Sequence, residues 1–187
     1  MRVLRSCAAA AALLAAGCGP VLFAELEIPS VRVTPPPEPF PAVLVPPATV
    51  VELSHAFSYD LGADVSVLTD PSVTSELRLT SVAIELVGGG VADLGAIRSV
   101  AVDVVAPPGT SLPDIRVAAY QRSAADPNPT TLTMAGYSNV NLAPYLADGV
   151  LAISAQLAYD ATTPAFTANV TGDFYVKARL DYGGAAR

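Results

Sequence analysis

Residues 166–180 alternate apolar and polar side chains without a break. The apolar positions are Phe166, Ala168, Val170, Gly172, Phe174, Val176, Ala178 and Leu180, and the polar positions are Thr167, Asn169, Thr171, Asp173, Tyr175, Lys177 and Arg179. Because successive side chains of a β-strand point to opposite faces, this run predicts one long strand with a packed face and a solvated face. A strand that is apolar on one side only is typical of an antiparallel sheet.

Shorter runs of the same period occur along most of the chain before residue 166. They lie at residues 21–28, 51–59, 65–68, 77–86, 100–104, 115–119 and 151–159. In the run at 77–86 the apolar phase changes between Leu79 and Val82, which predicts a β-bulge near Thr80 and Ser81. Together these runs and the turns between them predict an all-β fold, an antiparallel β-sandwich of about eight or nine strands.

One short helix is expected near residues 141–148. Asn141 can cap its first turn, Pro144 stands where a missing N–H costs least, and Gly149 follows where a helix tends to end.

The first eighteen residues have the layout of a secretory leader. Arg2 and Arg5 precede an apolar run at 7–16, and the leader ends in Leu14-Ala15-Ala16-Gly17-Cys18. This stretch resembles the bacterial lipoprotein signal, the lipobox, although Ala15 stands where leucine is usual three places before the cysteine. The resemblance implies that Cys18 receives a diacylglycerol, that the leader 1–17 is removed, and that the new amino group is acylated.

The lipoprotein resemblance also implies where the chain works. A lipid on Cys18 would make the membrane its first partner, and Gly19 in place of aspartate favours the outer membrane of the cell envelope. Cys7 would leave with the leader, so the mature chain would have no thiol for a disulfide, a zinc site or a cysteine nucleophile. Beyond the signal, the mature chain resembles uncharacterised all-β envelope lipoproteins, a likeness that brings no activity with it.

A proline-rich stretch divides the expected mature chain into an N-terminal segment, 18–47, and a β-sandwich domain, 48–187. Half of residues 34–47 are proline, and proline lacks the N–H donor that a helix or a central strand requires. In one interpretation, residues 18–47 are a tether between the membrane and the domain. In the other, residues 21–33 belong to the sheet and the prolines form an edge loop, and the apolar alternation before the prolines favours this second interpretation.

The charge balance argues against a nucleic-acid partner. The chain carries 10 Lys and Arg residues against 17 Asp and Glu residues, a formal charge of −7. Loss of Arg2 and Arg5 with the leader leaves 8 against 17, or −9. Such a surface repels phosphate backbones and anionic lipid alike.

The residues that carry chemistry elsewhere do not form a recognisable catalytic pattern here. His55 is the only histidine and lies on the apolar face of its run, where a core-edge position is expected rather than catalysis. Asp60, Asp64 and Asp70 stand at turns and lack the dense oxygen spacing of a calcium loop. Glu25 and Glu27 share a strand face, but nothing in the sequence gives one of them an acid role and the other a base role, so a glycosidase pair is not expected.

One surface remains as a candidate binding face. Tyr175, Lys177 and Arg179 project from the polar side of the last run and would suit an acidic or sugar partner. The alternative is a solvated strand face whose charges pair with neighbouring strands. The sequence thus favours a non-enzymatic lipoprotein without cofactor or metal, which contacts another envelope protein or a glycan. A ligand- or glycan-binding sandwich is the alternative function.

Overall fold

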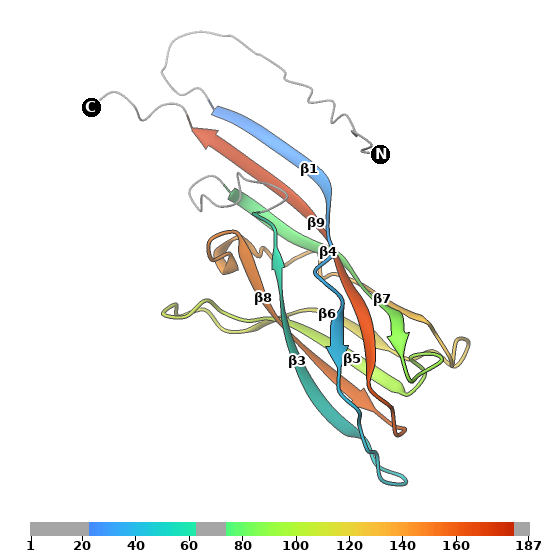
Figure 1. The fold of residues 1–187 in the computed structure, drawn as a ribbon. Coiled ribbons are helices and arrows are strands. Elements are labelled where there is room, and N and C mark those ends of the chain that lie inside the picture. The colour runs from blue at the N-terminus through green and yellow to red at the C-terminus, as the bar shows by residue number, and fades with distance from the viewer. Residues whose placement is uncertain (1–22, 63–73, 182–187) are drawn as a thin grey trace, which may run out of the picture.

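The computed structural model describes residues 23–62 and 74–181, and it confirms the all-β sandwich (Figure 1). Its elements are β1 (Phe23–Val33), β2 (Glu38–Phe40), β3 (Val51–Asp60), β4 (Thr74–Gly89), β5 (Ile97–Val104), β6 (Ile115–Gln121), β7 (Thr131–Ala135), the 3-10 turn η2 (Ala143–Tyr145), β8 (Val150–Tyr159) and β9 (Phe166–Asp181). The strands form two antiparallel sheets that pack face to face over one apolar core.

The first sheet is built around β9, the run with the longest alternation. Its order is β1-β9-β4-β7, and β2 pairs with the same edge of β9 as β1 does. The second sheet has the order β3-β8-β5-β6. Because β1 and β2 both take part in the first sheet, residues on each side of the first prolines belong to the sandwich, which confirms the strand interpretation of this segment.

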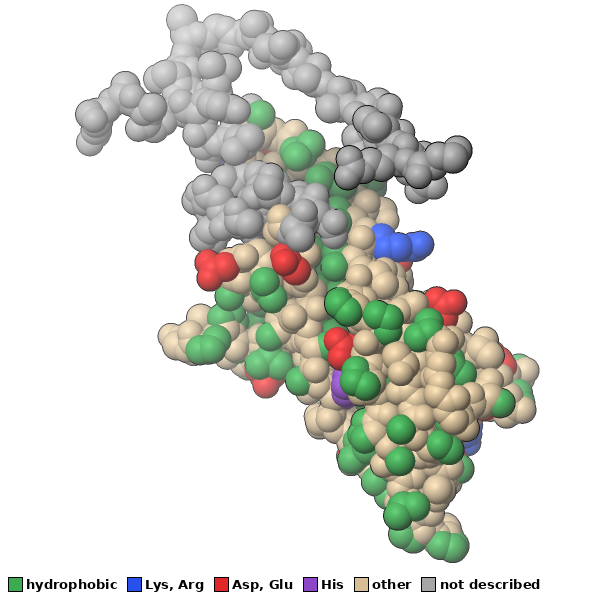
Figure 2. All heavy atoms as spheres, viewed as in Figure 1, with side chains coloured by type: hydrophobic (Ala, Val, Ile, Leu, Met, Phe, Trp, Pro, Cys, Tyr) green, Lys and Arg blue, Asp and Glu red, His purple; other side chains and the backbone are tan. Residues whose placement is uncertain are grey.

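Among the described residues, backbone pairing joins the two sheets along one side only. Where β6 approaches β7, Ala118 forms a bridge with Gly136, and the Tyr137 backbone N–H donates to the Val117 carbonyl at 2.7 Å. On the opposite side, β3 faces the β1 and β2 edge without pairing to it. We call this second side the open side; Figure 2 shows it with the only histidine, in purple, at its surface.

Ring side chains fill the open side and connect the sheets. The rings follow one another at centroid distances of 4.8, 4.4, 6.3, 5.4 and 5.2 Å. We call this set the aromatic row; its members in order are Phe166, Phe40, His55, Phe57, Tyr59 and Phe174. The row crosses from the first sheet to the second and back, so it takes the place of the strand pairing that the other side has.

The expected bulge is present, and β4 contains two more. The register of β4 against β9 shifts between Leu79 and Ser81, as the change of phase predicts, and Thr80 Oγ1 donates to the Asp173 carbonyl at 2.9 Å. Further shifts lie between residues 74 and 76 and between residues 86 and 88. The run at 65–68 lies outside the described residues.

The expected helix at 141–148 is wrong in extent. Only one 3-10 turn forms, at Ala143–Tyr145. Asn141 Oδ1 accepts from the Ala143 N–H and also from the Leu77 N–H, both at 3.0 Å, so it ties the turn to β4. Within residues 23–62 and 74–181, there is no helix of the length and apolar character needed to cross a membrane.

Candidate functional site

The predicted binding face on β9 is largely occupied by ion pairs with β1. Tyr175 Oη donates to Glu27 Oε1 at 3.1 Å. Lys177 Nζ lies 3.3 Å from Glu25 Oε2 and 3.6 Å from Glu27 Oε1, while Arg179 is exposed near the end of the strand. These contacts agree with the second interpretation of this face, in which the charges of the strand pair with those of neighbouring strands.

The same neighbours raise the pKa values of two groups on this face. The carboxylate of Glu25 raises the pKa of the Lys177 ammonium, and desolvation together with Glu27 raises the pKa of the Tyr175 hydroxyl. Both groups stay protonated at neutral pH. An acidic ligand would have to displace two carboxylates that already lie beside Lys177, so this face is poorly suited to such a ligand.

A hollow of about 380 Å³ lies beside Tyr175, between β1, β4 and the end of β7. It forms where β1 and β4 both shift register, at 28–31 and 79–81. Its lining residues are Pro29, Glu76, Arg78, Leu79, Thr80, Gly136, Ser138 and Tyr175. The Arg78 guanidinium carbon lies 6.0 Å from the Tyr175 ring centroid, and Arg78 is also paired with Glu76.

Sequence reasoning found one of these lining residues and missed the rest. Of the three predicted residues, only Tyr175 borders the hollow. Arg78 was overlooked, although the change of phase at Thr80 and Ser81 marks the point where β4 departs from regular geometry and leaves space.

Asp173 ties three strands of the first sheet together. Its carboxylate accepts two hydrogen bonds from Arg32, at 2.8 and 3.1 Å, and one from Ser81 Oγ at 2.9 Å. The hydrogen bond from Arg32 is the main reason why the pKa of Asp173 lies below its usual value. Asp173 therefore holds β1, β9 and β4 in register, which is a structural role.

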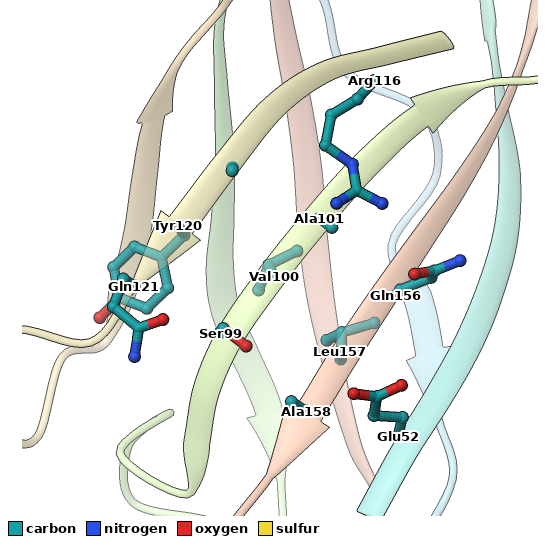
Figure 3. A pocket seen from close by; sticks show the side chains of 11 residues that line it. Glu52, Ser99, Val100, Ala101, Arg116, Tyr120, Gln121, Gln156, Leu157 and Ala158 are labelled. Carbon is teal, nitrogen blue, oxygen red and sulfur yellow. The ribbon is translucent and has the colours of Figure 1, made fainter. Parts of the chain in front are cut away.

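A second hollow, a trough of about 370 Å³, runs over the outer face of the second sheet (Figure 3). Small side chains form its floor on the central strands, among them Ser99, Ala101 and Ala158. Its larger polar lining residues are Glu52, Arg116, Tyr120, Gln121 and Gln156.

The larger polar residues of the trough come from three strands. Glu52 lies on β3 at one side, Gln156 on β8, and Tyr120 and Gln121 on β6 at the other side (Figure 3). Arg116 is held by Asp103 through two hydrogen bonds of 2.9 and 3.0 Å. The Tyr120 ring belongs to the inner face, because Tyr120 pairs with the buried Val100 and packs against the core. The amide groups of Gln121 and Gln156 over a shallow floor can bind a polar, uncharged ligand such as a sugar.

Sequence reasoning did not find this trough. The only signal for it is the run of serine and alanine at the outward positions of β3, β5 and β8, a pattern that by itself indicates a solvated strand face.

His55 lies on the inner face of β3, as expected of a core-edge histidine. Its side chain is 17% exposed and stacks on Phe40. His55 Nε2 lies 3.4 Å from Glu38 Oε2, without the alignment of a hydrogen bond. The part of the chain that the structure describes contains no group of three or more His, Cys, Asp or Glu residues placed to hold a metal ion.

Of the other carboxylate and cysteine candidates, some form ion pairs and the rest lie outside the described residues. Glu25 and Glu27 face Lys177, not a shared cleft. Asp64, Asp70 and the predicted lipid site Cys18 lie outside the described residues.

Comparison with known proteins adds no family. No family model matches the chain, and no curated protein matches it. Among solved structures it is similar to a chain from Desmodium yellow mottle tymovirus, with 10% sequence identity and a TM-score of 0.35 over 96% of this chain and 99% of that chain. A likeness at this TM-score carries no inference about function.

Proposed function

We propose that the chain is a lipid-anchored β-sandwich of the bacterial cell envelope, which acts as a structural or interaction module and catalyses no reaction. The observation that carries the proposal is the sequence Leu14-Ala15-Ala16-Gly17-Cys18 placed directly before the first strand of a sandwich. Cys18 would carry the lipid, and Gly19 favours retention in the outer membrane.

The position of β1 supports a short connection to the bilayer. Five residue steps separate Cys18 from Phe23, which can span at most about 18 Å. The proline-rich stretch comes after β1, so it cannot serve as a spacer between the lipid and the sandwich. The domain would sit against the membrane, with the start of β1 and the end of β9 nearest the lipid because Phe23 pairs with Asp181 (Figure 1).

The chemistry of the described surface supports binding or scaffolding over catalysis. The outer face of the first sheet is crossed by ion pairs, and the histidine is stacked inside the aromatic row. Neither arrangement places a nucleophile beside a base.

Processing and fractionation test the anchor. Globomycin should cause the unprocessed chain to accumulate, and Cys18→Ser should move the protein out of the membrane fraction. Cys7→Ser is the matched control, because a leader cysteine that carries no lipid can be replaced without effect. A Cys18→Ser protein that stays in the membrane fraction would refute the proposal.

Glycan binding in the trough is a second candidate function. It is favoured by the Glu52, Gln121 and Gln156 side chains around a floor of small residues. Calorimetric titration of the acylated protein with muropeptide disaccharide should show binding, and Gln156→Ala, in the trough, should abolish it. Tyr175→Ala, on the other sheet, is the control. Equal binding by both variants would exclude the trough.

A further inference from the structure

We propose that the open edge of β3 accepts an extended strand from another envelope protein, which adds to the second sheet next to β3. The choice of another protein over a second copy of this chain depends on the lipid anchor proposed above.

The edge of β3 is long and regular. β3 pairs with β8 in unbroken antiparallel register over ten residues, from Val51 opposite Tyr159 to Asp60 opposite Val150. Among the described residues, no strand pairs with its other edge. An edge of this kind presents a row of backbone N–H and C=O groups to which a further strand can bond.

The usual protections of an edge strand are missing from β3. Natural sheets block their edges with proline, lysine, bulges or very short strands. The sequence of β3, VELSHAFSYD, contains no proline, lysine or glycine, and its pairing with β8 has no register shift.

The edge of the first sheet on the same open side is protected by proline, by a register shift and by a very short strand. β1 shifts register between Ile28 and Val31, around Pro29. β2 is three residues long and contains Pro39. Of the two edges on the open side, one is blocked and the other is left available.

The side chains of β3 indicate what the partner strand must carry. On the inner face, Val51, Leu53 and Phe57 are only half-buried, so apolar side chains on an added strand would cover them. On the outer face, Glu52 is exposed near the start of the strand. The partner that fits is a segment alternating apolar and polar residues, with a cationic side chain at the end that meets Glu52.

A second copy of this chain does not fit both the edge and the anchor. Antiparallel pairing of two β3 strands centred on His55 would turn the second copy end for end. Its lipid would then lie at the far end of the sandwich, where β9 alone, at 16 residues, is about 50 Å long. A connection of about 18 Å cannot cover that distance.

Parallel pairing of two copies fails for another reason. A twofold axis along the strands would bring the apolar inner face of one β3 beside the polar outer face of the other. Leu53 and Phe57 would remain half-exposed, next to Ser54 and Ser58 of the second copy.

Hydrogen exchange on the acylated full chain in nanodiscs tests the edge. The probe is a short synthetic peptide that alternates valine and threonine between terminal lysines. At about ten times the dissociation constant, exchange of the β3 amides that point to the open edge should slow about tenfold, while amides of β5 stay unchanged. A peptide with proline at every threonine position cannot complete the ladder and should have no effect.

Site-specific trapping gives a matched control. Ser54 on β3 and Ser154 on β8 both lie on the outer face, but only Ser54 borders the open edge. A valine-threonine peptide carrying a pyridyl disulfide should react faster than its proline counterpart with Ser54→Cys, and no faster with Ser154→Cys.

Three results would overturn the proposal. The first is equal behaviour of the two peptides in both assays. The second is protection that falls elsewhere than β3. The third is cross-linking of two Ser54→Cys chains to each other in nanodiscs, which would identify a second copy as the occupant. The β3 readouts can be repeated on the Cys18→Ser chain, so they can fail while Cys18→Ser still leaves the membrane fraction, and the reverse also holds.

Discussion

Replacement of Tyr59 by phenylalanine should stabilise the protein. Tyr59 is fully buried in the aromatic row, and its hydroxyl has no hydrogen-bond partner among the described residues. A buried hydroxyl without a partner costs about 1–3 kcal/mol of folding free energy. Tyr59→Phe removes the oxygen and keeps the ring contacts with Phe57 and Phe174, so we expect the free energy of unfolding to rise by about 1 kcal/mol.

Tyr145 provides the matched control with the opposite sign. It is also buried, but its hydroxyl donates a hydrogen bond to the Pro113 carbonyl at 2.9 Å. Tyr145→Phe should lower the free energy of unfolding by about 0.5–1.5 kcal/mol. Urea unfolding followed by circular dichroism measures both changes, and a change of 1 kcal/mol corresponds to roughly 2–4 °C in the melting temperature of a chain this size.

The same hydroxyl predicts a pH dependence. Burial, with a smaller contribution from the Asp173 charge, raises the pKa of Tyr59, and burial raises the pKa of Tyr159 to about 12. An unfolded tyrosine ionises near pH 10. Above about pH 10 the unfolded chain loses protons that the folded chain keeps, so stability should fall with rising pH, and less steeply in Tyr59→Phe. A Tyr59→Phe protein that is less stable than the parent at pH 7 would refute the reasoning, because it would mean that the hydroxyl has a partner.

Three further substitutions test the packing and the strand pairing. Gly172→Ala should lower the free energy of unfolding by about 1–3 kcal/mol, since a Cβ there would come within 2.9 Å of the Tyr59 ring; urea titration measures the loss. Asp173→Asn should flatten the acid limb of the stability curve below about pH 4, because the hydrogen bond from Arg32 lowers the pKa of Asp173 and its contribution disappears as the pH falls through that lowered value; an unchanged acid limb would contradict this. His55→Ala should lower the free energy of unfolding by about 1 kcal/mol because the ring stacking on Phe40 is lost. Thermal melting measures this, and an unchanged melting temperature would contradict the prediction.

The fold could be predicted wherever one face of a strand is buried and the other is wet. The alternation at 166–180 corresponds to β9 almost residue for residue, and the change of phase near Thr80 locates a real bulge. Where one face of a strand is buried, shifting the strand pairing by one residue would expose its apolar side chains. Any such shift must therefore be accompanied by a change of phase in the sequence.

The features that could not be predicted depend on contacts between distant segments. β7 is five residues long and gains its place from β4, and β2 forms among prolines because β9 supplies an edge. The sequence predicts that Asn141 caps a helix. In the structure its side-chain oxygen accepts from both the Ala143 N–H and the Leu77 N–H of β4, and only a 3-10 turn forms. The hollow beside Tyr175 requires the register shifts of β1 and β4 to fall side by side, and the trough requires small outward side chains on neighbouring strands, so both depend on strand pairing.

The central place of β9 has a consequence for the order in which the chain can fold. β9 is the last of the described strands to be synthesised, yet β1, β2 and β4 all bond to it. Strands β3, β5, β6 and β8 can assemble into the second sheet before residue 166 has been made, whereas the first sheet must wait. A nascent chain therefore keeps β1 unpaired, and β4 paired with β7 alone, until its final segment emerges, and it needs protection from aggregation for that whole interval.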